Sequence, residues 1–177
     1  MRAKMICAAA LLSAACAGTP ENEGEGSDLE MRASATLETM KRKDPAIQKL
    51  IGQSHGYVVF PGIGKGGFIA GGAHGIGVVY ERGRPVGYAE LNQASIGAQL
   101  GGQTFSELVV LRDVQTFDRL KRDRFELGVD ASAVAITVGG GKAARFQKGV
   151  AVFVMPSGGL MVDMSVNGQQ ITFEPRG

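Results

Sequence analysis

Tryptophan is absent from this 177-residue chain, and aromatic residues make up only 6% of it. A hydrophobic core must therefore be built from Val, Ile, Leu, Met and Ala. A chain of this length buries enough surface for one domain without cross-links. The two cysteines, Cys7 and Cys16, both lie within the first 16 residues. The rest of the chain therefore contains no disulfide and no cysteine-based metal site.

Histidine is also scarce, and no catalytic set of residues can be recognised. Neither His55 nor His74 has a nearby cysteine or acidic cluster that would complete a metal site. Ser95 and Ser132 lack the turn that presents a catalytic serine. Asp130 is the best enzymatic candidate, but a carboxylate in an apolar strand is more typical of a hydrogen-bonded structural group. We therefore expect no enzymatic activity, no metal and no cofactor.

The chain also has no strong excess of either positive or negative charge. The 19 Lys and Arg residues face 17 Asp and Glu residues, a formal net charge of +2. From Glu30 onward, 17 basic residues face 13 acidic ones. This mild excess is compatible with an anionic binding surface, but it is too weak to predict binding to nucleic acid.

The N-terminal residues have the pattern of a signal peptide. Arg2 and Lys4 form a positive segment, and the apolar run 5–12 that follows is too short to span a membrane. Small residues come next and end at Cys16. We therefore interpret residues 1–16 as a signal peptide.

The end of this segment resembles a bacterial lipobox, which predicts that Cys16 is the lipid attachment site. Ser13 departs from the pattern, which prefers an aliphatic residue there, and ordinary cleavage after Ala17 is the alternative. The polar, acidic residues 17–27 predict a disordered linker. We expect a lipid-anchored protein of the bacterial cell envelope. Ala17 favours the outer membrane facing the periplasm, and the alternative is a secreted or periplasmic protein.

Three helices are expected from capping residues and apolar spacing. Ser27, three residues before a glutamate, has capping-box spacing. Asp44 and Asp113 are suitable caps for two later helices. Apolar residues of the helices, Met31 and Val114 among them, are expected to face the core. The expected helices span 28–43, 45–52 and 114–123.

Glycines dominate the segment Gly56–Gly102, which holds 14 of the chain's 27 glycines. They alternate with aromatic and β-branched residues, and glycine inside a strand marks a bulge or a close backbone approach. The expected strands lie near 56–61, 67–72, 75–82, 85–91, 94–101, 104–112, 149–155, 159–166 and 169–174. Short turns between them predict a curved, antiparallel, barrel-like sheet. The fold class expected is α+β, mostly β, with N-terminal helices and one helix near 114–123.

A glycine-rich motif at 62–67 contains the spacing G-x-G-x-x-G. No helix is expected after it, and no Gly-Lys-Ser/Thr sequence occurs, so we predict no nucleotide binding. Lys65 and the backbone N–H groups around it could still hold a phosphate of a lipid headgroup. The simpler interpretation is a tight turn with a solvated lysine.

Two clusters of basic residues lie on expected helices. Such clusters are usually solvated helix faces, but close to a membrane they attract anionic headgroups. The candidate headgroup-binding residues are Arg119, Lys121, Arg122 and Arg124 in and after the third helix, and Lys41 and Arg42 in the first.

Taken in order, several stretches resemble the SYLF domain family. They are 56–68, 71–79, 108–111 with the helix behind it, Leu127–Ser132 (LGVDAS) and the closing segment 152–168. The resemblance covers about residues 28–173 and implies a lipid-binding domain, here 28–177. The family is found in bacterial envelope proteins and in eukaryotic proteins near membranes and actin.

The resemblance implies non-enzymatic binding of anionic membrane lipids, phosphoinositides in eukaryotes, and it strengthens the case for Lys65. The alternative is a structural or partner-binding envelope lipoprotein whose folded domain does not contact lipid. The sequence names no protein partner and no oligomeric state.

Overall fold

The computed structural model describes most of the chain from Thr19 onward. The predicted lipidation site Cys16, the cation Arg124, the residues Asp130 and Ser132, and the expected strand 159–166 lie outside the described residues. The described residues are 19–20, 22–66, 70–96, 103–122, 125–127, 135–139, 145–157 and 168–176.

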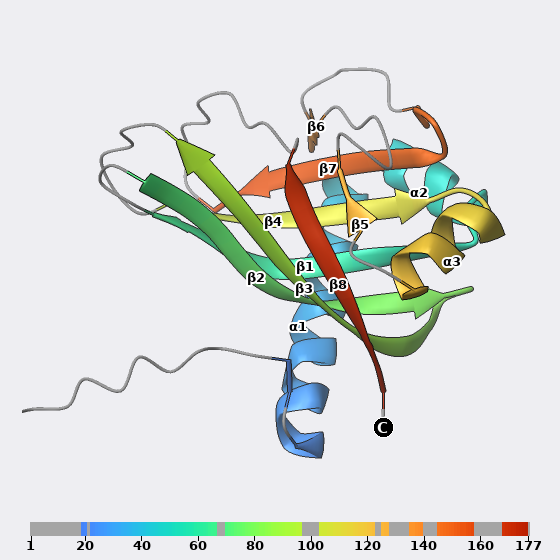
Figure 1. The fold of residues 1–177 in the computed structure, drawn as a ribbon. Coiled ribbons are helices and arrows are strands. Elements are labelled where there is room, and N and C mark those ends of the chain that lie inside the picture. Colours follow the sequence, from blue (N-terminus) through green and yellow to red (C-terminus); the bar gives the residue numbers. More distant parts are fainter. Residues whose placement is uncertain are drawn as a thin grey trace, which may run out of the picture.

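In this described part, eight strands form one sheet in the order β5-β8-β3-β2-β1-β4-β7-β6 (Figure 1). Neighbouring strands are antiparallel except β6 and β7, which are parallel. The sheet curls into an open half-barrel, which confirms the expected mostly-β α+β fold with a curved sheet. The strands are β1 (Gly56–Gly66), β2 (Ala70–Glu81), β3 (Arg84–Ile96), β4 (Gln103–Leu111), β5 (Phe125–Glu126), β6 (Ala135–Thr137), β7 (Val150–Pro156) and β8 (Gln169–Pro175).

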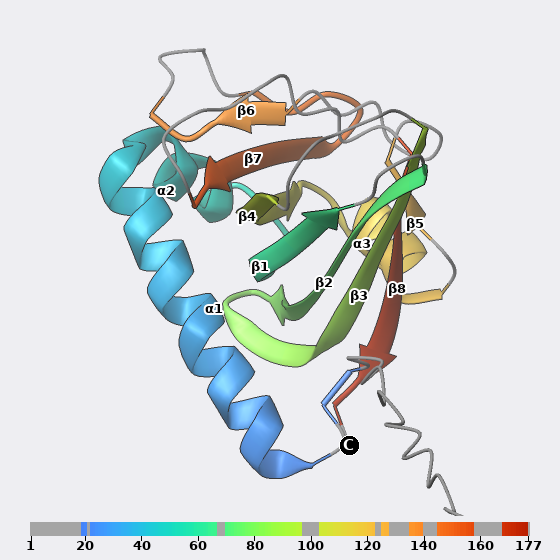
Figure 2. The same ribbon diagram turned by 90° about the vertical axis from the view of Figure 1, so that its left-hand side faces the viewer.

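Helices cover both faces of the half-barrel. The helices α1 (Glu23–Lys43) and α2 (Pro45–Gly52) lie along the convex face, and α3 (Val114–Arg122) lies on the concave side (Figure 2). α2 begins at its expected N-cap, since the Asp44 side chain accepts a hydrogen bond from the Ala46 N–H. Thr116 N–H donates to Asp113 Oδ1 at 2.8 Å, which confirms the expected cap of α3.

The core has two layers, one on each face of the sheet. Because side chains alternate along a strand, Phe105 and Val109 of β4 point into the concave layer, whereas Leu108 and Val110 point into the convex one. The concave layer also contains Phe117 and Leu120 of α3. The convex layer is completed by α1 and α2, through Leu29, Ala33, Leu37, Met40, Ile47 and Leu50.

The glycine-rich segment forms fewer and longer strands than the sequence predicted. β1 continues past Pro61 through a bulge, where the register shifts between Phe60 and Ile63. The Ser106 hydroxyl donates to the Pro61 carbonyl at 2.9 Å, which ties the bulge to β4. β2 and β3 each replace two expected strands, because residues 73–74 and 92–93, which were expected to separate those strands, pair with each other in the sheet.

Gly77 of β2 shows why glycine is needed there. A Cβ atom at this position would lie 2.6 Å from Cδ1 of Phe60, whose ring packs across the glycine. The expectation that glycines permit a close approach of another part of the protein is confirmed at this position.

α1 begins at Glu23, not at the expected Asp28. Asn22 is the N-cap, and its side chain accepts a hydrogen bond from the Glu25 N–H at 3.0 Å. Acidic residues in the first turn also favour a helix N-terminus. The expected cap at Ser27 is therefore wrong, and residues 23–27 belong to the helix rather than to a disordered linker.

Two apolar residues that were expected to face the core are exposed. The exposed fraction is 65% for Met31 of α1 and 49% for Val114 of α3. Met31 lies off the stripe that packs on the sheet, and Val114 is the first residue of its helix. The rest of the predicted stripe of α1 packs on the sheet, as expected.

Candidate functional site

Several chain segments meet at the end of the half-barrel that carries α3. β1 begins there while β2 and β4 end there, since Gly56 pairs with both Glu81 and Leu111. The His55 N–H donates to the Leu111 carbonyl at 3.0 Å, and the Arg82 N–H donates to the His55 carbonyl at 3.0 Å. We call this region the α3 end. It lies on the right of Figure 1.

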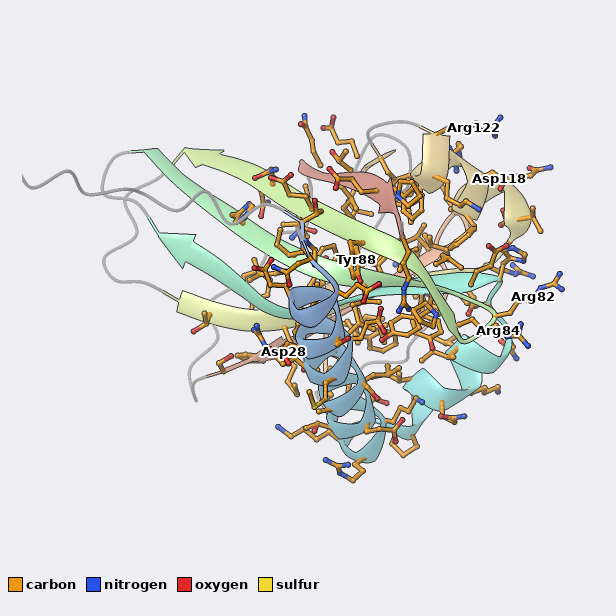
Figure 3. All side chains as sticks on the ribbon, turned by 90° about the horizontal axis from the view of Figure 1, so that it is seen from below. Asp28, Arg82, Arg84, Tyr88, Asp118 and Arg122 are labelled. Atoms are coloured by element: carbon orange, nitrogen blue, oxygen red, sulfur yellow. The ribbon has the colours of Figure 1, made fainter. Side chains whose placement is uncertain are left out.

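The turn between β2 and β3 presents two arginines at the α3 end. Arg82 and Gly83 have φ values of 50° and 80°, the left-handed backbone of a two-residue hairpin turn. Arg82 and Arg84 are both exposed on this turn. Figure 3 shows them on the same end of the molecule as Arg122 of α3.

α3 lies beside this turn. Lys121 Nζ of α3 lies 3.6 Å from Glu81 Oε2, the last residue of β2. The same amine lies 5.5 Å from the centroid of the buried Phe117 ring. These contacts fix the helix next to the turn and bring five exposed cations to one end. We call this set the basic surface; it consists of Arg82, Arg84, Arg119, Lys121 and Arg122.

Two carboxylates at the α3 end, those of Glu81 and Asp113, have hydrogen-bond partners. Burial raises the pKa of Glu81, but its hydrogen bond with His55, at 2.9 Å, and the charge of Lys121 outweigh this, so the pKa is lowered. The hydrogen bond from the Thr116 N–H lowers the pKa of Asp113. Both groups are therefore ionised at neutral pH, and Glu81 partly neutralises Lys121 of the basic surface.

Comparison with known proteins identifies the second half of this domain. Residues 92–176 match the family model Ysc84, described as a Las17-binding protein actin regulator. Residues 92–176 belong to the Ysc84 (SYLF) family. No curated protein matches the chain.

The Ysc84 segment includes β4, α3, β7 and β8, and so supplies the three α3 cations of the basic surface. It confirms the predicted resemblance over the stretches from 108 onward. The stretches 56–68 and 71–79, and with them Arg82 and Arg84, precede the segment. Their assignment to the family stays a prediction.

The structure separates Lys65 from the basic surface. Its backbone pairs with Ala73 and Gln103 at the far end of β1, nine residues from Gly56 at the α3 end. At about 3.3 Å per residue, the two ends of β1 lie roughly 30 Å apart. Lys65 and the α3 cations therefore do not form one binding site.

Lys41 and Arg42 lie in the last turn of α1 and make contacts within the helix. Lys41 Nζ lies 2.9 Å from Glu38 Oε1, and Arg42 Nη2 donates to Thr39 Oγ1 at 2.9 Å. Such pairs on a helix surface are weak, so they do not prevent either cation from meeting a headgroup. Whether these residues bind lipid stays a prediction.

One buried polar pair in the Ysc84 segment was not expected. Glu107 of β4 and Gln169 of β8 are both fully buried, and Gln169 Nε2 donates to Glu107 Oε2 at 3.1 Å. Three strands separate β4 from β8 in the sheet, so this bond crosses the hollow of the half-barrel. Burial raises the pKa of Glu107 to about 7.

The same pair leaves two oxygens without a hydrogen-bond partner, Glu107 Oε1 and Gln169 Oε1. Little in the sequence predicts this pair, because apolar residues dominate the run from Phe105 to Leu111 around Glu107. A charged residue inside such a run is the one signal that could have marked it.

Neither a metal-binding cluster nor a membrane-spanning helix is found among the residues that the structure describes. No group of three or more His, Cys, Asp or Glu side chains among them is arranged to hold a metal ion. None of the helices in that part of the chain is long and apolar enough to cross a membrane.

Proposed function

We propose that this domain binds anionic lipid headgroups through the basic surface, without catalysis, while an acyl anchor on Cys16 holds it at a membrane of the bacterial envelope. The observation that supports this proposal best is the position of the β2–β3 turn beside α3. Arg82, Arg84 and Arg122 come from segments far apart in the sequence, yet they face solvent at one end. The Ysc84 family is known for binding related to lipids and actin.

The charge of this surface is sufficient for a measurable affinity. Each basic residue near an anionic membrane contributes about 1 kcal/mol, so five contribute about 5 kcal/mol at most. The interaction weakens with salt, because exposed charges are screened over about 8 Å at physiological ionic strength. The domain alone should therefore bind weakly and reversibly, and the anchor should provide most of the residence time.

Glu30 of α1 contacts the strand that carries Arg84. The Tyr88 hydroxyl donates to Glu30 Oε1 at 3.3 Å, and Arg176 Nη1 lies 2.9 Å from the same oxygen. Tyr88 follows Arg84 by four residues along β3. Cys16 precedes α1 by only seven residues, so an anchored chain would keep the strand end that carries Arg84 near the membrane.

Vesicle flotation tests the proposal on the full chain with Cys16→Ser, so that no acyl anchor can form. We expect salt-sensitive flotation with phosphatidylglycerol vesicles and none with phosphatidylcholine vesicles. The double variant Arg82→Glu/Arg122→Glu should weaken binding by about 2 kcal/mol or more, which corresponds to about 30-fold.

The matched control is Arg32→Glu/Lys43→Glu, which changes the net charge equally with two exposed residues of α1. An equal loss in both variants would show that net charge, not the basic surface, decides binding. If the unanchored chain floats with no vesicle, the folded domain does not bind lipid. The alternative function, as a structural or partner-binding lipoprotein, then replaces the proposed one.

A further inference from the structure

A second cationic site lies at the α3 end, and none of its described lining residues belongs to the basic surface. It is an open pocket of about 720 Å³ between α2, the junction of β4 with α3, and the segment that precedes β7. Pockets of this size hold small-molecule ligands. The described residues that line it are Ala46, Lys49, Leu50, Gln53, Arg112, Arg145 and Phe146, and we call it the basic pocket.

The lining combines three cations with no carboxylate. Lys49, Arg112 and Arg145 come from three separate segments, and none of them forms an ion pair with another described residue. Arg112 is one of the charges that lower the pKa of Asp113, and that carboxylate also accepts hydrogen bonds from Thr116. The pocket therefore carries an excess of positive charge that an anion could neutralise.

An aromatic ring lies beside the exposed Arg112 side chain in the pocket. Its guanidinium lies 5.9 Å from the centroid of the Phe146 ring, a cation–π geometry. Its backbone N–H donates to the Gly149 carbonyl at 2.8 Å. The Arg112 guanidinium can donate two parallel hydrogen bonds to one phosphate group.

We propose that the basic pocket binds a phosphomonoester carried on a small polyol. A monoester carries up to two negative charges at neutral pH, which suits three convergent cations better than the single charge of a phosphodiester. Inorganic phosphate alone would leave most of the pocket empty, and the Gln53 amide offers a neutral donor and acceptor for hydroxyl groups. The phosphomonoester can be free, as in a sugar phosphate, or part of a lipid headgroup.

Calorimetric titration of the full chain with Cys16→Ser tests the free form of the ligand. We expect saturable binding of glucose 6-phosphate, weaker binding of inorganic phosphate and none of glucose. Arg112→Gln/Arg145→Gln should weaken binding of glucose 6-phosphate about 100-fold or more, since each lost charge-assisted contact costs about tenfold or more. Lys49→Gln, on the exposed face of α2, is the milder variant that preserves folding.

The matched control is Arg82→Gln/Arg122→Gln, which removes two cations from the basic surface and should leave glucose 6-phosphate affinity unchanged. Flotation with vesicles of phosphatidic acid or phosphatidylglycerol, at equal surface charge, tests whether the pocket binds a phosphomonoester in a lipid headgroup. A preference for phosphatidic acid that is lost only in the pocket variants supports the pocket and assigns its ligand to lipid. The proposal is overturned if neither glucose 6-phosphate nor phosphatidic acid is preferred, or if the control loses as much affinity for glucose 6-phosphate as the pocket variants.

The basic pocket does not depend on the function proposed for the basic surface. Failure of all vesicle binding would remove that function and still allow glucose 6-phosphate to bind. Absence of glucose 6-phosphate binding, with intact flotation on phosphatidylglycerol vesicles, would count against the basic pocket and leave the function of the basic surface unaffected.

Discussion

At the residue scale, Glu107 shows how the curl of the sheet changes the chemistry of one side chain. Its carboxyl group is fully buried in the concave layer, and the charged form loses its hydration there. The single hydrogen bond from Gln169 favours the charged form but does not offset burial, so the pKa is raised to about 7. When Glu107 is neutral, its hydrogen bond with Gln169 links β4 to β8 across the half-barrel without burying a charge.

This environment predicts that the stability of the protein decreases as the pH rises through the range between the two pKa values of Glu107. The ordinary pKa is 4.5 and the folded value is about 7, so the folded state binds more protons between them. The contribution of this group is complete below about pH 4.5 and is lost by about pH 7. The total loss is on the order of 3 kcal/mol of unfolding free energy.

Urea unfolding from pH 5 to pH 8 measures this effect. Glu107→Gln cannot ionise and can still pair with Gln169, so the pH dependence should become flatter and the variant should be the more stable protein at pH 8. Asp28→Asn, which removes an exposed carboxyl from α1, should leave the slope unchanged. An unchanged slope in Glu107→Gln would mean that Glu107 is already ionised in the folded protein.

At the element scale, helices were easier to predict than strands. The starts of α2 and α3 were predicted correctly from the caps Asp44 and Asp113, because capping depends on a few neighbouring residues. The strands of the glycine-rich segment were divided too finely. A glycine that closes a turn and a glycine that makes room for a ring, as Gly77 does for Phe60, look alike in sequence.

The start of α1 gives a direct test at this scale. Asn22→Ala removes the side-chain acceptor for the Glu25 N–H and should reduce the unfolding free energy by about 1 kcal/mol. Ser27→Ala, at the cap expected from the sequence, lies inside the helix and should have little effect or stabilise slightly. Urea unfolding midpoints of the two variants decide between the caps, and a larger loss in Ser27→Ala would contradict the observed start.

At the scale of the whole molecule, topology decides which cations act together. The sequence identified Arg119, Lys121 and Arg122 as candidates from their spacing on one helix. Arg82 and Arg84, at the junction of two expected strands, were not candidates, because nothing local shows that β2 ends beside α3. The sequence also grouped Lys65 with the helix cations, although β1 places that residue at the opposite end of the sheet.

The central claim is that the headgroup-binding surface combines the β2–β3 turn with α3. The most direct measurement is the affinity of the Cys16→Ser chain for phosphatidylglycerol vesicles, with Arg82→Gln/Arg84→Gln compared with Lys65→Gln. Two lost cations should cost about 2 kcal/mol, so we predict a loss of about 30-fold for the turn variant and no measurable change for Lys65→Gln. A loss in Lys65→Gln with an unchanged turn variant would move the site to the other end of the half-barrel and contradict the account.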